Sequence, residues 1–484
     1  MSFHFLNGTS YGPYSDTGPG TIIVDPLAEI HAVGQVTSAL TLFAGPWTVK
    51  IDGTVDSEDA HAITILGGGK YRSNVTIGVG AEISAGGTIS AGIAASYATN
   101  MTNAGHVTGG FVGLNVYGNG SYAIKNLKTG VIEGDYSGIY ASAAGMHTIL
   151  NAGKIVADLG IAGGAGIEVV TNYGTVEGGI SLADNNDVFT NFKKVGHSIK
   201  HGAVTGTIDL GDGNDVFNGG KTREFIKDSG GKDLYKLGSG NDHFIGYLNG
   251  GADRTDSVNG GRGIDAYDAS QAGVLGVIIN LDGKTHFDTA YTRIIAANRA
   301  NDVNNTTTAA DKILSIENAY GSAGNDSMFG TKGANELVGG DGNDHVFGLA
   351  GNDRLFGNNG LDALVGGAGK DELWGGANDD LFVFQSLKDS GTATATIDTI
   401  MDFEGAGVAG GDLIDLDLLN ATLGNKITGF LGVDVDFTEN AGDLRAVTQG
   451  ANTIVELDIN GDKKADFSIQ LDGHHVLTVD DFYL

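Results

Sequence analysis

Large apolar residues recur at every ninth position between Gly321 and Val383, and glycine-rich turns separate them. The range divides into seven tandem nonapeptides, each with a large apolar residue at position eight. Successive side chains of a strand point to opposite faces, so position eight points inward while its two neighbours point outward. The pattern predicts short strands stacked in a solenoid. The expected core residues are Met328, Leu337, Val346, Leu355, Leu364, Leu373 and Phe382.

Position six of these nonapeptides is aspartate in all but one repeat. Glycine in the preceding turn permits the left-handed backbone conformations that so tight a turn requires. A second, interrupted block of nonapeptides lies upstream, between Leu210 and Asp268, with aspartate at the same position. The position-six residues are Asp215, Asp233, Asp242, Asp256 and Asp265 upstream, and Asp326, Asn335, Asp344, Asp353, Asp362, Asp371 and Asp380 downstream.

The first 200 residues show a longer period. Asn103, Asn126, Asn151 and Asn172 lie near glycines and are separated by 23, 25 and 21 residues. A period of about 20–50 residues is typical of solenoids, and the alternating Val, Ile, Thr and Ala around these asparagines favour strands. We therefore predict a right-handed parallel β-helix whose asparagines turn the corners and stack as a ladder. The chain runs from it into the upstream nonapeptides without a linker. Earlier rungs are expected at residues 21–24, 47–51, 62–66, 74–77 and 82–89.

The charge of the chain restricts its partners. The net charge is −31, which excludes nucleic acid, because affinity for phosphates rests on Lys and Arg. Self-repulsion of this size destabilises a compact fold, so a cation is expected to neutralise it. Calcium fits best, because this hard ion is bound by carboxylate and carbonyl oxygens.

The composition sets further limits. Glycine accounts for 81 of 484 residues and the hydrophobic fraction is 41%, which fits a folded chain with many tight turns. The chain has no cysteine and therefore no disulfide. Its first ten residues lack the cationic and apolar regions of a Sec signal, and no stretch approaches the ~18 apolar residues of a membrane span.

The nonapeptides resemble the G-G-x-G-x-D-x-U-x repeats of the RTX (repeats-in-toxin) calcium-binding family. The resemblance implies that two nonapeptides form one coil of a parallel β-roll, with each calcium between the turns of repeats n and n+2. It implies the aspartate pairs Asp326–Asp344, Asp344–Asp362, Asp353–Asp371 and Asp362–Asp380, and a pair Asn335–Asp353 that is weakened because Asn335 carries no charge. Turn carbonyls would supply the other oxygens, and the upstream block would bind at least one calcium.

From Phe382 onward the sequence resembles the C-terminal secretion domain of the serralysin family. The likeness rests on short motifs such as Asp389-Ser390, Asp402-Phe403 and Asp466-Phe467. It implies export by the type I secretion machinery with an uncleaved C-terminal signal, and hence a secreted, extracellular protein. The signal residues that it implies are Asp480, Asp481, Phe482, Tyr483 and Leu484.

One further calcium loop is a candidate within this C-terminal segment. Asp458, Asn460, Asp462 and Asp466 place four oxygen-bearing side chains within nine residues, a spacing that suits one calcium. The alternative is a solvated β-turn that carries these acids for solubility.

No catalytic motif emerges from the chain. The zinc motif H-E-x-x-H of the serralysin proteases is absent. A G-x-S-x-G match at residues 8–12 is followed by Pro13 instead of a helix, which argues against a nucleophile elbow. Lys70-Tyr71-Arg72 is the one basic-aromatic cluster of the N-terminal rungs. We therefore expect no enzyme, and the alternative is a polysaccharide-active β-helix enzyme, a lyase or an epimerase, with its acid–base groove near this cluster.

The fold expected from these patterns is all-β: a parallel β-helix or β-solenoid that continues into an RTX β-roll, with a β-sandwich-like C-terminal cap. Five segments are expected. They are residues 1–200 (β-helix), 201–268 (first RTX block), 269–320 (intervening segment), 321–383 (second RTX block) and 384–484 (cap and secretion domain).

The N-terminal rungs resemble repeats of bacterial surface proteins. The expected function is that of a secreted, calcium-dependent surface-layer, matrix or adhesin protein. Its partners would be calcium, the secretion machinery, and either further copies of itself or a cell-surface polysaccharide. An adhesin would show an exposed aromatic patch, for which the candidates are Trp47, Tyr117, Tyr122, Tyr136 and Tyr140.

Overall fold

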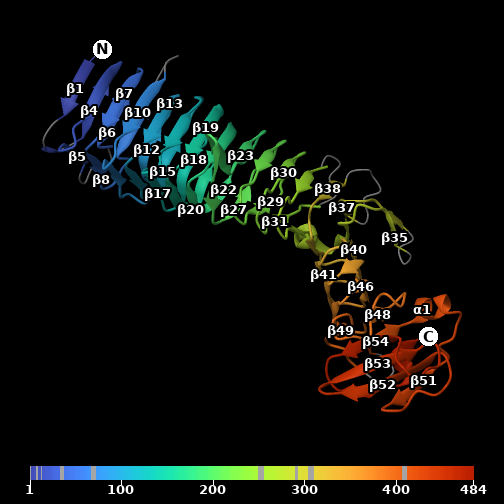
Figure 1. Cartoon of the computed structure of the whole chain (residues 1–484). Coiled ribbons are helices and arrows are strands. Elements are labelled where there is room, and N and C mark those ends of the chain that lie inside the picture. Colours follow the sequence, from blue (N-terminus) through green and yellow to red (C-terminus); the bar gives the residue numbers. More distant parts are fainter. Residues whose placement is uncertain are drawn as a thin grey trace. The chain divides into compact units, whose positions relative to one another are not determined.

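The computed structural model describes residues 2–6, 9–11, 13–32, 38–66, 72–248, 255–288, 293–302, 310–405 and 411–484. Contacts within the chain divide it into two compact units. Unit 1 comprises Met1–His243 and Asp256–Gly263, and unit 2 comprises Phe244–Thr255 and Ile264–Leu484. Both are built almost entirely from β-strands (Figure 1), which confirms the all-β fold class. The finer division into five segments stays a prediction.

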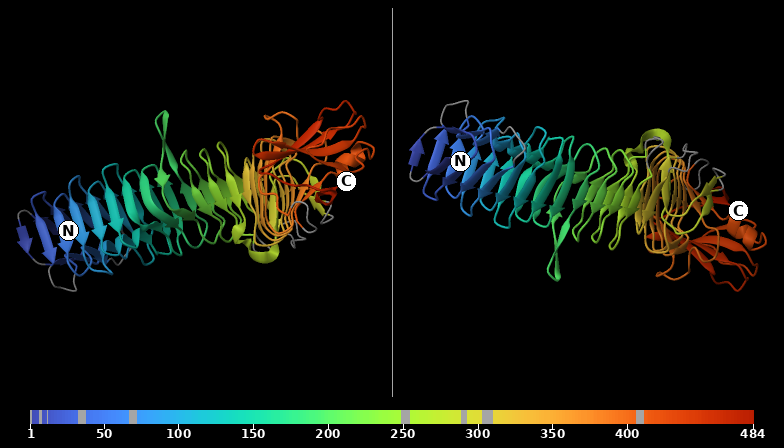
Figure 2. Two further views of the ribbon diagram at one scale, coloured as in Figure 1. Left: turned by 90° about the horizontal axis from the view of Figure 1, so that it is seen from below. Right: turned by 90° about the horizontal axis from the view of Figure 1, so that it is seen from above.

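Unit 1 is a parallel β-helix whose first coils carry three strands each (Figure 2). The first stack of paired strands contains β1 (Ser2–Leu6), β4 (Gly20–Val24), β7 (Trp47–Ile51), β10 (Ser73–Ile77), β13 (Thr99–Asn103), β16 (Ala123–Asn126), β19 (Met146–Asn151), β21 (Ile167–Asn172), β23 (Val188–Thr190), β28 (Val216–Asn218), β30 (Leu234–Lys236) and β32 (Ser257–Asn259). Most of the rungs predicted from the sequence fall on these strands.

Two further stacks complete the coils. The second contains β2 (Thr9–Tyr11), β5 (Glu29–Ala32), β8 (Thr54–Ser57), β11 (Glu82–Ala85), β14 (His106–Gly109), β17 (Val131–Gly134), β20 (Lys154–Ala162), β22 (Thr175–Ser181) and β26 (Ala203–Val204). The third contains β3 (Tyr14–Thr17), β6 (Leu40–Phe43), β9 (Ile63–Leu66), β12 (Ala91–Ala95), β15 (Val112–Val116), β18 (Ser137–Ala141), then β20 and β22 again, β27 (Thr207–Asp209) and β29 (Phe225–Lys227).

The coils become narrower along unit 1. Strand β20 pairs with both β17 and β18, so the second and third stacks merge there, with register shifts between Val156 and Leu159. Hydrogen-bonded corner residues are 23 residues apart at Asn103 but 18 residues apart at Asp215. A coil of 18 residues holds two nonapeptides, so the shorter coils at the end of unit 1 have the length that the nonapeptide repeats require.

Alternating side chains explain why these segments form strands. In β7, Trp47, Val49 and Ile51 are buried while Thr48 and Lys50 are exposed, as expected for a half-buried strand. The coil between β23 and β26 also carries an antiparallel hairpin of β24 (Phe192–Val195) and β25 (Ser198–His201). Strand β31 (His243–Ile245) contains the division between the units.

Asparagines form a buried ladder along unit 1, as predicted. The Nδ2 of Asn103 donates to the Oδ1 of Asn126 (3.0 Å), and the same bond joins Asn126 to Asn151 (2.9 Å) and Asn151 to Asn172 (2.9 Å). The ladder then passes through Asn191 and ends at a carboxylate oxygen of Glu224. Each rung also donates to a backbone carbonyl of the next coil, so the ladder satisfies the buried corners.

Unit 2 begins with a two-sheet β-roll. One sheet contains β34 (Val277–Asn280), β40 (Ser327–Phe329), β42 (His345–Phe347), β45 (Ala363–Val365), β48 (Leu381–Val383), β50 (Leu413–Asp415) and β55 (Phe482–Tyr483). The other contains β33 (Ala266–Asp268), β39 (Asn318–Tyr320), β41 (Glu336–Asp341), β44 (Arg354–Asn359), β47 (Glu372–Ala377), β49 (Asp398–Ile400) and β54 (Phe467–Leu471). The predicted position-eight residues are all buried.

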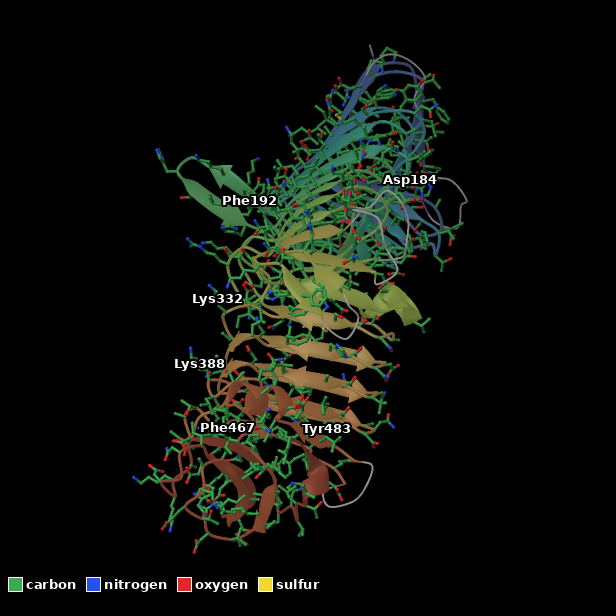
Figure 3. All side chains as sticks on the ribbon, turned by 90° about the vertical axis from the view of Figure 1, so that its right-hand side faces the viewer. Asp184, Phe192, Lys332, Lys388, Phe467 and Tyr483 are labelled. Carbon is green, nitrogen blue, oxygen red and sulfur yellow. The ribbon has the colours of Figure 1, made fainter. Side chains whose placement is uncertain are left out.

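The C-terminal segment continues both sheets of the roll. Strand β54 joins β49 and is followed outward by antiparallel β53 (Asn452–Asp458) and β52 (Asp443–Gln449), then by β51 (Phe430–Val433). Phe467 on β54 and Tyr483 on β55 mark these two additions in Figure 3. The remaining elements are β35 (His286–Asp288), β36 (Arg293–Ile295), β37 (Arg299–Asp302), β38 (Asp311–Leu314), β43 (Ala350–Gly351), β46 (Ala368–Gly369), α1 (Asp417–Thr422) and two 3-10 helices, Ser270–Leu275 and Val479–Asp481.

Among the described residues, no helix has the length and apolar character needed to cross a bilayer.

Breaking the asparagine ladder tests its contribution to unit 1. We expect Asn126→Ala to lower the free energy of unfolding of these coils by about 1–3 kcal/mol, because two buried hydrogen bonds and one partly buried hydrogen bond are lost. Asn74→Ala is the matched control, because it removes one exposed bond to Asn100. Hydrogen exchange of β16, β19 and β21 measures the difference, and equal protection in the two variants would contradict the ladder's role.

Candidate calcium-binding site

The position-six aspartates of the second block form two buried columns. The backbone N–H of Asp326 donates to the Oδ1 of Asp344 (2.8 Å). In the same way, the N–H of Asp344 donates to the Oδ1 of Asp362 (2.7 Å), and the N–H of Asp362 donates to the Oδ1 of Asp380 (2.9 Å). All are at most 2% exposed. Each bond spans 18 residues, so two nonapeptides form one coil, as the RTX resemblance implies. In the other column, Asn335 donates to the Oδ1 of Asp353 and Asp353 to that of Asp371 (both 2.8 Å).

The second oxygen of most of these carboxylates is buried without a hydrogen bond among the described residues. The Oδ2 atoms concerned belong to Asp344, Asp353, Asp362, Asp371, Asp380 and Asp398. A buried carboxylate oxygen without a partner is costly unless a cation or a proton neutralises it. Each column therefore contains a row of buried carboxylate oxygens that a cation would stabilise.

Glycine at position one leaves space beside each of these oxygens. A Cβ on Gly339 would lie 2.2 Å from the Oδ2 of Asp344, and one on Gly357 would lie 2.3 Å from that of Asp362. Position four has φ values from +112° to +157° at Gly342, Gly351, Gly360 and Gly369, where other residues would be strained.

The residues present fit calcium. Carboxylate and carbonyl oxygens are the ligands that this hard ion takes, and the Oδ2 atoms with the turn carbonyls offer both. Bound calcium would supply the positive charge that the columns lack.

The first repeats of each column differ from the rest. Asp326 already accepts hydrogen bonds from Val277 N, Ser322 N and Ser322 Oγ. The amide of Asn335 is occupied by Thr331 and Glu317. The side chains of these two turns are therefore already satisfied without a cation. For Asn335 this agrees with the prediction that the Asn335–Asp353 pair binds calcium more weakly.

Burial raises the pKa of the column aspartates. Loss of solvent, followed by repulsion from Asp326, raises the pKa of Asp344 to about 9. The pKa of Asp353 rises to about 8 and that of Asp380 to about 8, in both cases chiefly through burial. Asp344, Asp353 and Asp380 thus hold protons near neutral pH unless a cation displaces them.

Both columns extend beyond the predicted repeats. Asp371 N donates to the Oδ1 of Asp398 (2.8 Å) and Asp380 N to that of Asp412 (2.9 Å). These two aspartates were not predicted from the sequence as members of the columns. The signal was present, because each is followed two positions later by a buried isoleucine, Ile400 or Ile414.

The upstream block forms a similar column in unit 1. Asp215 N donates to the Oδ1 of Asp233 (2.7 Å), and Asp233 N to that of Asp256 (2.6 Å). Asp242 accepts from Glu224 N (2.8 Å). Glu224 occupies position six of the nonapeptide Gly219–Lys227. This nonapeptide was not predicted from the sequence, because it has glutamate where the pattern has aspartate.

In unit 2, Asp265 is buried in the same kind of turn, and its N–H donates to Glu317 (2.9 Å). Glu317, like Glu224, is a glutamate where the repeats carry aspartate.

Three buried carboxylates meet in unit 1. Ligand atoms of Asp228, Asp233 and Asp256 lie within 4.8 Å of one another. The hydroxyl of Tyr235 donates to Asp228 (3.1 Å) and to Asp233 (3.2 Å). Asp228 stands at position one of its nonapeptide, where the other block has glycine, so its carboxylate enters the space beside the position-six residue. This cluster is a candidate calcium site that includes two predicted residues and one that the sequence analysis missed.

The C-terminal loop is hydrogen-bonded within itself. Asp458 accepts from the N–H groups of Asn460, Gly461 and Lys463. Burial opposes its ionisation, but these donors hold the pKa of Asp458 below its usual value. Asp466 accepts from Ile459 N and Asn460 Nδ2, and Asp462 from Lys464 N. The geometry favours the β-turn alternative, and calcium at this loop stays a prediction.

The C-terminal residues assigned to the secretion signal are folded. Asp480 and Asp481 lie in the short 3-10 helix, where Thr478 N donates to Asp481 (2.5 Å). Phe482 is buried on β55, Tyr483 is exposed, and Leu484 ends the chain.

Filling the space beside one carboxylate tests the calcium columns. We expect Gly357→Ala to raise the calcium concentration needed to fold the roll, through about 1–3 kcal/mol of overpacking. Gly333→Ala is the matched control, because its Cβ would meet nothing closer than 3.8 Å. Calcium titrations followed by circular dichroism compare the two, and equal midpoints would argue against a cation in this space.

The raised pKa values predict an unusual pH dependence without calcium. Between about pH 4 and pH 9 the unfolded aspartates are ionised while Asp344 stays protonated in the fold, so rising pH favours unfolding. In a chelator, we expect the roll to lose stability from about pH 5 to pH 8. Calcium should reverse the trend, because it binds the ionised form. Thermal melts across this range decide, and stability that rises with pH in the chelator would refute the assignment.

Comparison with known proteins bears on the second block. Residues 320–355 and 356–384 match the family model described as the RTX calcium-binding nonapeptide repeat (4 copies). One similar solved structure is the solution structure of the AlgE6R3 subunit from the Azotobacter vinelandii mannuronan C5-epimerase. It is 28% identical, covers 33% of this chain and 77% of that chain, and has a TM-score of 0.18. No curated protein matches the chain. Residues 320–384 are thus RTX calcium-binding repeats.

Proposed function

We propose that this chain is a secreted structural or surface protein that folds when it meets extracellular calcium. The observation that carries the proposal is the row of buried carboxylate oxygens without hydrogen bonds in the described roll. Such a row is stable only when cations or protons neutralise it, so calcium binding to the ionised carboxylates would favour folding of the roll.

Linkage explains how this would operate. Ions that bind the folded turns and not the unfolded chain contribute their binding free energy to folding. Extracellular calcium sites respond at about 10⁻⁴–10⁻³ M, so they would stay empty in a cytosol. The acidic chain would then remain extended by its own repulsion, ready for export by the type I machinery that the C-terminal resemblance implies.

A basic hairpin supports a surface or matrix role. Strands β24 and β25 stand out from the coils of unit 1, and Phe192 marks their start in Figure 3. Lys194 and Lys200 are exposed beside the exposed apolar residues Val195 and Ile199. On a chain of net charge −31, this hairpin fits an acidic partner, such as another copy of the chain or an anionic polysaccharide.

Two of the aromatic residues on which the adhesin alternative depends are buried. The expectation that Trp47 and Tyr122 belong to an exposed aromatic patch is wrong, because both side chains are 1% exposed and pack in the core. Tyr117 and Tyr140 are partly buried against the core. Tyr136 is exposed and stacks on Phe111 at 4.9 Å between ring centroids.

The enzyme alternative remains a polysaccharide lyase or epimerase. It needs a base and a charge-neutralising group in one groove. Lys70 and Tyr71 lie outside the described residues, and Arg72 donates to Asn100 (3.1 Å). Cleavage or epimerisation of a uronate polymer by the purified chain would establish this function instead.

Electron microscopy of the purified chain tests the structural role. We expect ordered sheets or filaments in millimolar calcium and none in a chelator. The variant Lys194→Glu/Lys200→Glu should weaken assembly, whereas Lys125→Glu/Lys128→Glu, with the same charge change on exposed lysines, should not. Discrete folded monomers in calcium would refute self-assembly and direct attention to polysaccharide binding.

A further inference from the structure

In unit 1, the column of position-six residues begins upstream of the nonapeptides predicted from the sequence. Glu168 N donates to the Oδ1 of Asp187 (2.7 Å), and Asp187 N to that of Asp215 (2.7 Å). These are the bonds that join successive aspartates in the roll. The family match covers neither residue.

Degenerate nonapeptides account for this extension. Residues 163–171 read GGAGIEVVT, which is the nonapeptide with glutamate at position six and the buried Val170 at position eight. Residues 182–190 read LADNNDVFT, with Asp187 and the buried Phe189 in the same places. Glu168 thus lies in a turn of the repeat type, within the β-helix of unit 1.

Glu168 and Asp187 hold three buried oxygens that accept no hydrogen bond from an N–H or hydroxyl group in the described part of the chain. These atoms are Oε1 and Oε2 of Glu168 and Oδ2 of Asp187, and both residues are 0% exposed. Glu168 alone contributes two of these oxygens, whereas each turn of the roll with an unpartnered carboxylate oxygen contributes one. The two carboxyl groups lie within hydrogen-bond reach of each other, so they can share either a cation or a proton.

The buried histidine of the preceding coil does not neutralise this pair. The Nε2 of His147 is 3.9 Å from Glu168 Oε1, but it donates to Ala143 O (2.9 Å). The Nδ1 of His147 accepts from Tyr122 N (3.3 Å), so the ring is neutral and both nitrogens are occupied. Oxygen ligands therefore remain, which select a hard cation over a transition metal.

We propose that Glu168 and Asp187 bind a calcium ion inside the β-helix of unit 1, so that the cation column starts at β21. The column stops there because the preceding coils place His147 and Tyr122 at position six. This inference rests on the calcium-dependent folding proposed above and extends it to coils outside the residues that the family model matches.

Anomalous diffraction from crystals of the full chain grown with terbium(III) in place of calcium tests the site directly. We expect a peak between Glu168 and Asp187 in addition to peaks between the stacked aspartates of the roll. Peaks in the roll without one at Glu168 would overturn this site and would indicate a shared proton instead. The absence of peaks in the roll as well would refute calcium-dependent folding itself.

Hydrogen exchange supplies a second readout. Calcium chloride at about ten times its dissociation constant should slow exchange in β19 and β21 by about tenfold in the wild-type chain. Glu168→Gln should abolish this effect. Glu177→Gln is the matched control, because Glu177 is half-exposed on β22 of the same coil and pairs with Lys154 (2.9 Å). Calcium-dependent protection that survives in Glu168→Gln would overturn the proposal.

Discussion

One hydrogen bond sets the geometry of the repeat region: a backbone N–H at position six donates to the position-six carboxylate of the next coil. The bond uses one oxygen and holds the other in the dry interior, facing the gap that a glycine leaves. Such an oxygen cannot return to water without opening the coil. The spacing of the strands, the need for glycine and the demand for positive charge all depend on this arrangement.

The chemistry at position six changes along the chain while the backbone pattern stays the same. Tyr122 and His147 satisfy themselves with backbone partners. From Glu168 onward the position is acidic in unit 1, and in the nonapeptides of residues 321–383 it is aspartate throughout, apart from Asn335. A solenoid can make this change one coil at a time, because each repeat contacts only its neighbours. Metal-independent and metal-dependent coils can therefore share one fold.

Much of this was predictable from local signals. The nine-residue spacing placed Asp344 and Asp362 on neighbouring coils, and four asparagines predicted the ladder. Its continuation to Asn191 and Glu224 was not predictable, because the spacing changes to 19 and then, across the basic hairpin, to 33 residues. The merging of two stacks at β20 depends on register shifts that have no local sequence signal. Glu168, Asp187 and Asp228 were missed because the search required aspartate after an intact glycine turn.

Each turn of the roll is hydrogen-bonded to the carboxylate of the next turn. Folding and calcium binding in one coil therefore depend on the neighbouring coils. Starting such a stack is unfavourable, because the first coil is ordered without a neighbour, whereas each later coil adds to a surface already formed. Pairing of β54 and β55 with the last coil supplies such a surface at one end. The fraction of calcium sites occupied in the roll should then rise with calcium concentration more steeply than it would for independent sites. Coils would fold one after another, starting from the end that β54 and β55 cover.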